Sequence, residues 1–187
     1  MRGKTRLPNS RPHVLLDTCV LLNLLATGEI ESILSALNKR WLVCAAVERE
    51  SLYLRTEDPN NPLQPVSLAS LLSTELLEIC DIENAAEAQL YVNYSARLDD
   101  GEAMSVALAV ARGYHLATDE RKARRIFLES GTALRLSGTS NIIKEWTEIE
   151  KISRERAKSV LLSVVHKARF LPSTSDENLQ WWKDLCS

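Results

Sequence analysis

The sequence predicts an α/β protein, a three-layer α/β/α sandwich around a central parallel sheet, with additional C-terminal helices. Short apolar runs typical of buried parallel strands alternate with helical patterns at intervals of roughly 20–30 residues. Two of these runs end directly at an acid, Asp17 and Asp119, as expected where a sheet holds ligands at its carboxyl edge. The chain has 187 residues, of which 45% are hydrophobic, and this suffices for one buried core.

Five short apolar segments are predicted to be the strands. The runs at 14–16 and 41–45 are apolar throughout, and the run at 115–117 leads into Thr118 and Asp119. Most of them are followed by a helical pattern, as in βαβ units. In chain order the predicted strands are 14–16, 41–45, 76–82, 115–117 and 132–136.

Helices are predicted where apolar residues recur at three- and four-residue spacing. The segment GEAMSVALAVARG, which opens at Gly101, is apolar on nearly every side and should be largely buried. Between the predicted helix at 47–54 and the predicted strand at 76–82, TEDPNNPLQP at 56–65 is rich in proline and asparagine and is expected to be a surface loop. The predicted helices are 19–25, 30–40, 47–54, 85–97, 101–113, 121–129, 141–151, 154–167 and 178–185.

The composition of the sequence predicts how the chain is divided and in which compartment the protein is found. We expect a basic N-terminal arm at 1–12, one main domain at 13–138 and a helical extension packed on it at 139–187. The net charge of −2 argues against a global basic field, and no run approaches the ~20 apolar residues of a membrane span. Cys19, Cys44 and Cys80 lie in no CxxC pair, so reduced core cysteines in a cytoplasmic protein are expected.

Acidic residues are predicted to converge at one edge of the sheet. Asp17 and Asp119 each follow a strand and precede a helix, so they share a crevice if their strands are neighbours. Glu102 lies in the first turn of a buried helix, where it could also simply complement the helix dipole. Glu50 is the fourth candidate, because it stands beside the apolar row of its predicted helix, whereas Glu48 lies on another face.

Several carboxylates in one pocket repel one another unless a cation compensates them. Mg²⁺ and Mn²⁺ prefer oxygen ligands and are commonly held by a few carboxylates together with water and substrate phosphates. Such a site orients water and polarises a phosphoryl oxygen, and the chemistry indicated is therefore phosphodiester hydrolysis.

The residues that carry this argument resemble the PIN-domain family. LLDTCVLLNLL is similar to the opening strand and helix of PIN domains, in which Asp is followed by Thr or Ser. GEAMSVALAVARGYHLATDERKARRIF is similar to their second half, and the four acids follow at intervals of 33, 52 and 17 residues. The likeness covers about 14–136, and the tail resembles the extension of a toxin-like subgroup.

The resemblance implies a Mg²⁺- or Mn²⁺-dependent ribonuclease acting mostly on single-stranded RNA. Asp17, Glu102 and Asp119 would be its metal ligands, and Glu50, or Glu48 in its place, the fourth catalytic acid. Many members are the toxin of a toxin–antitoxin pair and are dimers, so an antitoxin protein and a homodimer are implied partners.

Further residues have two readings each. Thr18 and Thr118 would support the acids through their hydroxyls, or would only cap strand ends. The cations after Asp119 would contact RNA phosphates, or would form a solvated helix face; they are Arg121, Lys122, Arg124 and Arg125. The rival functions are a catalytically silent PIN-like interaction module and another Mg-dependent α/β phosphohydrolase.

Overall fold

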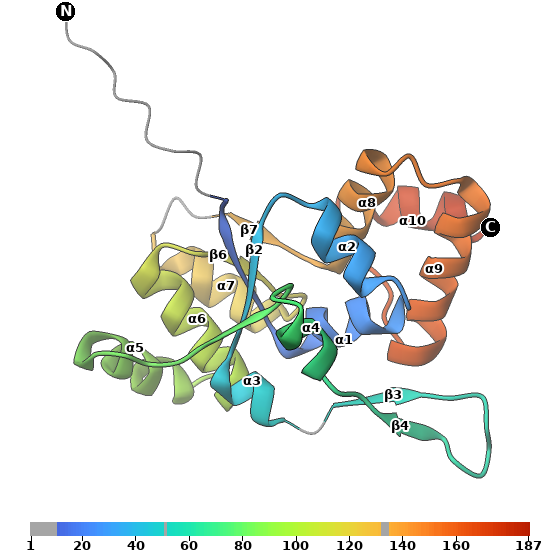
Figure 1. The fold of residues 1–187 in the computed structure, drawn as a ribbon. Helices are drawn as coiled ribbons and strands as arrows, with labels where there is room; N and C mark the ends of the chain where they lie inside the picture. The colour runs from blue at the N-terminus through green and yellow to red at the C-terminus, as the bar shows by residue number, and fades with distance from the viewer. Residues whose placement is uncertain (1–10, 51, 132–134) are drawn as a thin grey trace, which may run out of the picture.

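The computed structural model describes residues 11–50, 52–131 and 135–187. Its centre is a five-stranded parallel sheet with the strand order β5-β2-β1-β6-β7 (Figure 1). A separate antiparallel hairpin, β3–β4, projects from the body of the molecule. The strands are β1 His13–Leu16, β2 Arg40–Cys44, β3 Tyr53–Arg55, β4 Leu63–Pro65, β5 Glu78–Cys80, β6 His115–Ala117 and β7 Leu136–Ser137.

Helices cover both faces of the sheet, which confirms the predicted α/β/α sandwich. One face carries α5, α6 and α7, and α6 contacts β1, β2 and β6; the other carries α1 and α2 with α8 and α9 packed on them (Figure 1). α10 packs on α9. The helices are α1 Thr18–Ala26, α2 Ile30–Ala36, α3 Ala45–Arg49, α4 Ala69–Ser73, α5 Ala85–Ser95, α6 Asp100–Arg112, α7 Arg121–Glu129, α8 Thr139–Ile149, α9 Arg154–Ala168 and α10 Leu179–Cys186.

The core lies between the sheet and these two layers. Leu15 and Leu16 of β1 are inaccessible to solvent, and the body of α6 from Ala103 to Ala109 is buried, as its apolar sequence predicts. Burying apolar side chains on both faces of β1 is what a central parallel strand requires. The sheet therefore presents its polar residues only where the strands end.

Two sequence expectations about the segment after β2 are wrong. The predicted helix at 47–54 ends early: α3 stops at Arg49, and Glu50 is extended with φ −68° and ψ 143°. Tyr53 to Arg55 instead form β3, in which exposed and half-buried residues alternate, and they pair with β4. β4 lies at the end of the segment 56–65 that the sequence treats as a loop. Cross-strand pairing, which no local pattern reveals, overrides the helical spacing.

Other boundaries differ by smaller amounts. The helix predicted at 30–40 ends at Ala36 because Arg40 already begins β2, and the short helix α4 is not anticipated. Of the last predicted strand, Leu136 belongs to β7, while 132–134 lie outside the described residues. Most of the predicted arm, 1–10, also lies outside them.

The C-terminal helices share the core with the rest of the chain. Trp146 of α8 is fully buried, and its indole N–H donates to the Ser32 hydroxyl at 3.1 Å. Ile142, Ile143, Leu161 and Val164 join the same apolar cluster. The division of the chain into a main domain at 13–138 and a helical extension packed on it at 139–187 stays a prediction.

Two features concern membrane-spanning helices and the state of the cysteines. In the described ranges, no single helix is long and apolar enough to cross a membrane; α1 and α2 pass that test only as a pair bent by 112°. All four cysteines are free thiols, with Cys44 and Cys80 buried.

Candidate functional site

Asp17 occupies the turn from β1 into α1 and is only 2% exposed. One of its carboxylate oxygens accepts hydrogen bonds from the Thr118 hydroxyl at 2.7 Å and from the Cys19 thiol at 3.4 Å. The other accepts the backbone N–H of Thr18 at 2.8 Å. Burial raises the pKa of Asp17, and these three donors oppose the rise. The buried acid that stands out in the sequence is thus hydrogen-bonded, but it faces no cationic side chain through these contacts.

Asp17 opens into a cavity of about 410 Å³ that it shares with Glu50 and Glu102. Asp99 and Glu120 also line this cavity, and among the residues that the structure describes no Lys, Arg or His does. We call it the acid cavity. Five acids without a counter-ion are a strong concentration of negative charge, which favours either protonation or a bound cation.

Glu50 and Glu102 reach the acid cavity from two different helices, at the end of α3 and the start of α6. Glu50 follows α3, and its carboxylate accepts a 2.8 Å hydrogen bond from the Thr18 hydroxyl. Glu102 lies in the first turn of α6 and is half-buried. Burial is the main cause that raises the pKa of both carboxyls, and the negative charge of Asp17 raises them further.

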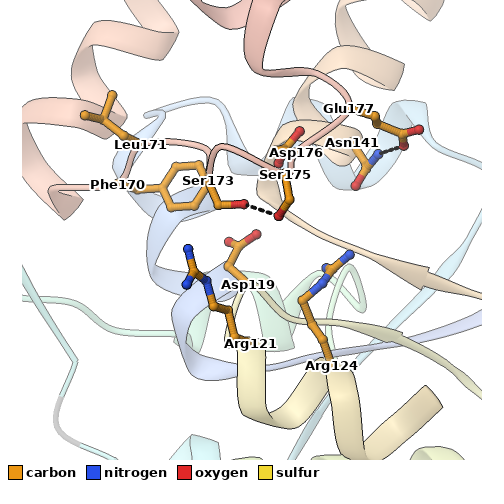
Figure 2. Close-up of a pocket in the computed structure, with 10 residues that line it drawn as sticks. All are labelled: Asp119, Arg121, Arg124, Asn141, Phe170, Leu171, Ser173, Ser175, Asp176 and Glu177. Atoms are coloured by element: carbon orange, nitrogen blue, oxygen red, sulfur yellow. Dashed lines mark hydrogen bonds between the residues drawn. The ribbon is translucent and has the colours of Figure 1, made fainter. Parts of the chain in front are cut away.

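Asp119 lies beside the acid cavity and not in its lining. Its carboxylate accepts the Thr139 hydroxyl at 2.6 Å, the Thr139 backbone N–H at 3.1 Å and the Asn23 amide at 3.2 Å. It lines two neighbouring hollows of about 390 and 370 Å³, the first of which is drawn in Figure 2. Burial raises the pKa of Asp119 against these donors.

Cys19 joins the two aspartate environments. Its thiol donates to Asp17 at 3.4 Å and accepts the backbone N–H of Asp119 at 3.4 Å. Cys19, Leu22 and Glu120 line both the acid cavity and the smaller of the two hollows beside Asp119. The structure therefore brings Asp17, Glu50 and Glu102 into one cavity and holds Asp119 against its margin.

Two glycines provide room for these carboxylates. A Cβ at position 101 would collide with Oε1 of Glu50, and a Cβ at position 138 would collide with Oδ1 of Asp119. Gly101 is in helix α6, where alanine would otherwise be favoured by roughly 1 kcal/mol. At both positions glycine leaves the space that a carboxylate oxygen occupies.

The donor chemistry suits a hard divalent cation. The acid cavity offers carboxylate oxygens and no competing base, and Mg²⁺ and Mn²⁺ favour such ligands. Within the described part of the chain, no three or more His, Cys, Asp or Glu side chains are grouped closely enough to hold a metal as they stand. Asp17, Glu50 and Glu102 fit the ion by chemistry, and binding would require their side chains to turn toward one another.

The remaining predicted residues have distinct surroundings. Glu48 is exposed and does not line the acid cavity. Arg124 is occupied in the fold, since it donates to the carbonyls of Thr118 at 2.7 Å and Ser137 at 3.2 Å. Arg125 pairs with Glu129 at 3.6 Å, while Arg121 and Lys122 are exposed.

Sequence reasoning missed several residues around the acids. Thr139 follows the last strand in the motif GTSN, so a strand-end hydroxyl was the available signal for its role beside Asp119. Glu120, next to Asp119, lines the acid cavity, and so does Cys19, which the sequence predicts only as a core residue. For Asp99 the sequence leaves open a cap of α6 or a place near the metal; it stands at the N-cap of α6 without a side-chain cap hydrogen bond and lines the acid cavity.

Comparison with family models gives one finding. A model described as PIN domain matches residues 13–179, which includes the acid cavity and runs through α8 and α9. Searches of curated proteins and of solved structures give no match. PIN domains are generally nucleases, so the fold described above is nuclease-like. The chain belongs to the PIN-domain family.

Proposed function

We propose that this protein is a divalent-metal-dependent ribonuclease that hydrolyses phosphodiester bonds of single-stranded RNA. The observation that carries the proposal is the acid cavity, in which Asp17, Glu50 and Glu102 meet without any basic residue. Family membership supports nuclease chemistry, and RNA is the substrate that PIN domains suggest.

The carboxylates divide the work according to their exposure. Asp17, Glu102 and Asp119 would hold Mg²⁺ or Mn²⁺, which when bound supplies a positive charge that polarises the phosphoryl oxygens. Glu50 is the most accessible of the four acids and its pKa is raised by burial, so it is suited to orient the attacking water and accept its proton. Thr18 and Thr118 position Glu50 and Asp17 through their hydroxyls.

In this proposal Asp119 acts from outside the acid cavity, where it has hydrogen-bond donors of its own. Its three hydrogen bonds from Thr139 and Asn23 hold the carboxylate in place at the margin of the acid cavity. Oδ1 accepts one of these hydrogen bonds and Oδ2 accepts two, so Oδ1 keeps a lone pair for a cation. Arg121 is exposed and lines the hollow beside Asp119, where it would meet RNA phosphates.

A matched pair of variants tests the proposal. Glu50→Gln and Glu48→Gln remove the same charge two residues apart, but only Glu50 lines the acid cavity. We expect the purified protein to cleave a single-stranded RNA oligonucleotide in Mn²⁺ and to stop in EDTA. Glu50→Gln should lower kcat at least tenfold, and Glu48→Gln should leave it unchanged.

Contrary outcomes point to the rival functions. A folded wild-type protein that binds Mn²⁺ but cleaves no RNA would support a silent interaction module. Hydrolysis of a small phosphoester in preference to RNA would support another phosphohydrolase.

The toxin role and its partners complete the proposal. The resemblance of the tail to a toxin-like subgroup supports a toxin held in check by an antitoxin protein and acting as a homodimer. Induced expression in a bacterial host should arrest growth, and Asp17→Asn should abolish the arrest. Sedimentation of the purified chain would measure the dimer directly.

A further inference from the structure

Resting on the proposed function, we propose that single-stranded RNA reaches the acids through a groove between the β3–β4 hairpin and the end of α9. This hairpin groove has a volume of about 370 Å³. Tyr53 and Arg55 line it from the hairpin, and Lys167 of α9 and the following Arg169 and Phe170 line it from the other element. β3 contacts both α9 and α1, so the hairpin is held against the body that carries the acids.

Charge separates the hairpin groove from the acid cavity. Arg55, Lys167 and Arg169 contribute three positive charges to the groove, and its two acids, Asp119 and Glu120, lie where it meets the acid cavity. The acid cavity has five acids and, among the described residues, no base. In the described residues the side chains of these three cations form no hydrogen bond or ion pair. Unpaired cations beside a nuclease site attract a polyanion, and each phosphate they meet releases counterions from the RNA.

The hairpin groove also offers two aromatic rings. Tyr53 is 49% exposed although it lies on a strand, and the half-buried Phe170 forms a T-shaped contact with the buried Trp182, with ring centroids 5.5 Å apart. Both rings line the groove, and Tyr53 is the more exposed of the two. Bases of a single strand can stack on such rings, whereas bases inside a duplex cannot, so the groove favours single-stranded RNA.

The hairpin groove is continuous with the acids. Cys19, Leu22 and Glu120 line both it and the acid cavity, and Asp119 forms part of its wall. Beyond Asp119 and Phe170 lies the hollow of Figure 2, where Arg121 and Arg124 face residues 173–177. A strand lying in the hairpin groove would therefore deliver its backbone to the carboxylates.

The basic helix α7 is the competing surface for RNA. There, Arg124 is engaged by two backbone carbonyls and Arg125 pairs with Glu129. Helix α7 thus has fewer uncommitted charges than the hairpin groove. Lys122 and Arg125 nevertheless provide a matched control, because they are exposed cations on α7 that do not line the groove.

The test is fluorescence anisotropy with a labelled single-stranded RNA oligonucleotide, in EDTA so that no cleavage occurs. Arg55→Gln/Lys167→Gln and Lys122→Gln/Arg125→Gln each remove two exposed charges. We expect the groove variant to bind about tenfold more weakly and to lose roughly 1.4 from its log–log salt slope, while the α7 variant binds like wild type. Equal losses in both, no loss in the groove variant, or no RNA binding by wild type would overturn the proposal.

The aromatic arm tests stacking and has its own control. Tyr53→Ala should weaken binding by about fivefold or more, and Tyr53→Phe, which keeps the ring, should retain the affinity. Equal affinity of Tyr53→Ala and wild type would overturn the stacking role. Cleavage by the wild-type protein in Mn²⁺ is measured separately. RNA binding that depends on the groove, without cleavage, would refute the proposed ribonuclease activity and leave the groove proposal intact. Cleavage without groove-dependent binding would refute the groove proposal and leave the ribonuclease activity intact.

Discussion

The Thr118 hydroxyl donates a 2.7 Å hydrogen bond to Oδ2 of Asp17, joining the ends of two neighbouring strands. The two residues are 101 positions apart, but the pairing of β1 with β6 sets Leu16 beside Ala117 and so aligns the residues that follow. This contact stabilises the ionised form of a carboxylate that burial disfavours. Thr118 therefore controls how readily Asp17 presents negative charge to the acid cavity.

Removing that donor should weaken the binding of a cation. Thr118→Val keeps the shape of the side chain but lets the pKa of Asp17 rise, so protons compete better with the metal. We expect the Mn²⁺ affinity, measured by calorimetry, to fall about tenfold below neutral pH and less at mildly alkaline pH. Thr118→Ser retains the hydroxyl and should behave like wild type; equal affinities in all three proteins would contradict the role of Thr118.

The metal-free protein should become less stable as the pH rises toward neutrality. Asp17, Glu50, Glu102 and Asp119 all have a raised pKa in the folded state, so the unfolded chain holds fewer protons and the free energy of unfolding falls with rising pH above the usual carboxyl range. Glu87 behaves oppositely: Arg112 lowers its pKa to about 2, and this stabilisation is lost only as the pH falls below 4.5.

Urea unfolding in EDTA at a series of pH values above 4.5 measures this dependence. Asp17→Asn should flatten the curve and leave the melting temperature at neutral pH unchanged or higher, because one unpaired buried charge is gone. If the free energy of unfolding of the wild-type protein instead increased toward neutral pH, repulsion among these four carboxylates would not destabilise the folded state.

The sequence predicts the strand ends well and their side-chain directions poorly. An apolar run ending in an acid can be recognised locally, and the parallel sheet then brings Asp17 and Asp119 to the same edge. Which cavity each carboxylate enters depends on Thr139, Asn23 and Thr118, whose contacts with the two aspartates cross 20, 96 and 101 residues of sequence. The hairpin is a similar case, because β3 exists only through pairing with β4.

Gly101 should prove necessary because Glu50 lies against it. Gly101→Ala would place a Cβ against Oε1 of Glu50 and at 3.3 Å from Val47. Because Oε1 is the end of a flexible side chain, Glu50 can turn aside, so we expect RNA cleavage to fall while the free energy of unfolding changes by no more than about 1 kcal/mol. In the Glu50→Ala background the same substitution should cause no further loss of cleavage. Additive losses in the double-mutant cycle would show that the two residues do not interact.

The two most deeply buried tryptophans should respond differently to replacement by phenylalanine. Trp146 donates its indole N–H to Ser32, whereas the buried Nε1 of Trp182 is the one side-chain nitrogen in the described ranges that is buried without a hydrogen-bond partner. Both variants lose similar ring volume, but only Trp146→Phe breaks a hydrogen bond, and Trp182→Phe removes an unsatisfied donor. We expect Trp146→Phe to cost about 1–2 kcal/mol more in urea unfolding. Equal losses would mean that Trp182 has a partner in solution, such as an ordered water molecule.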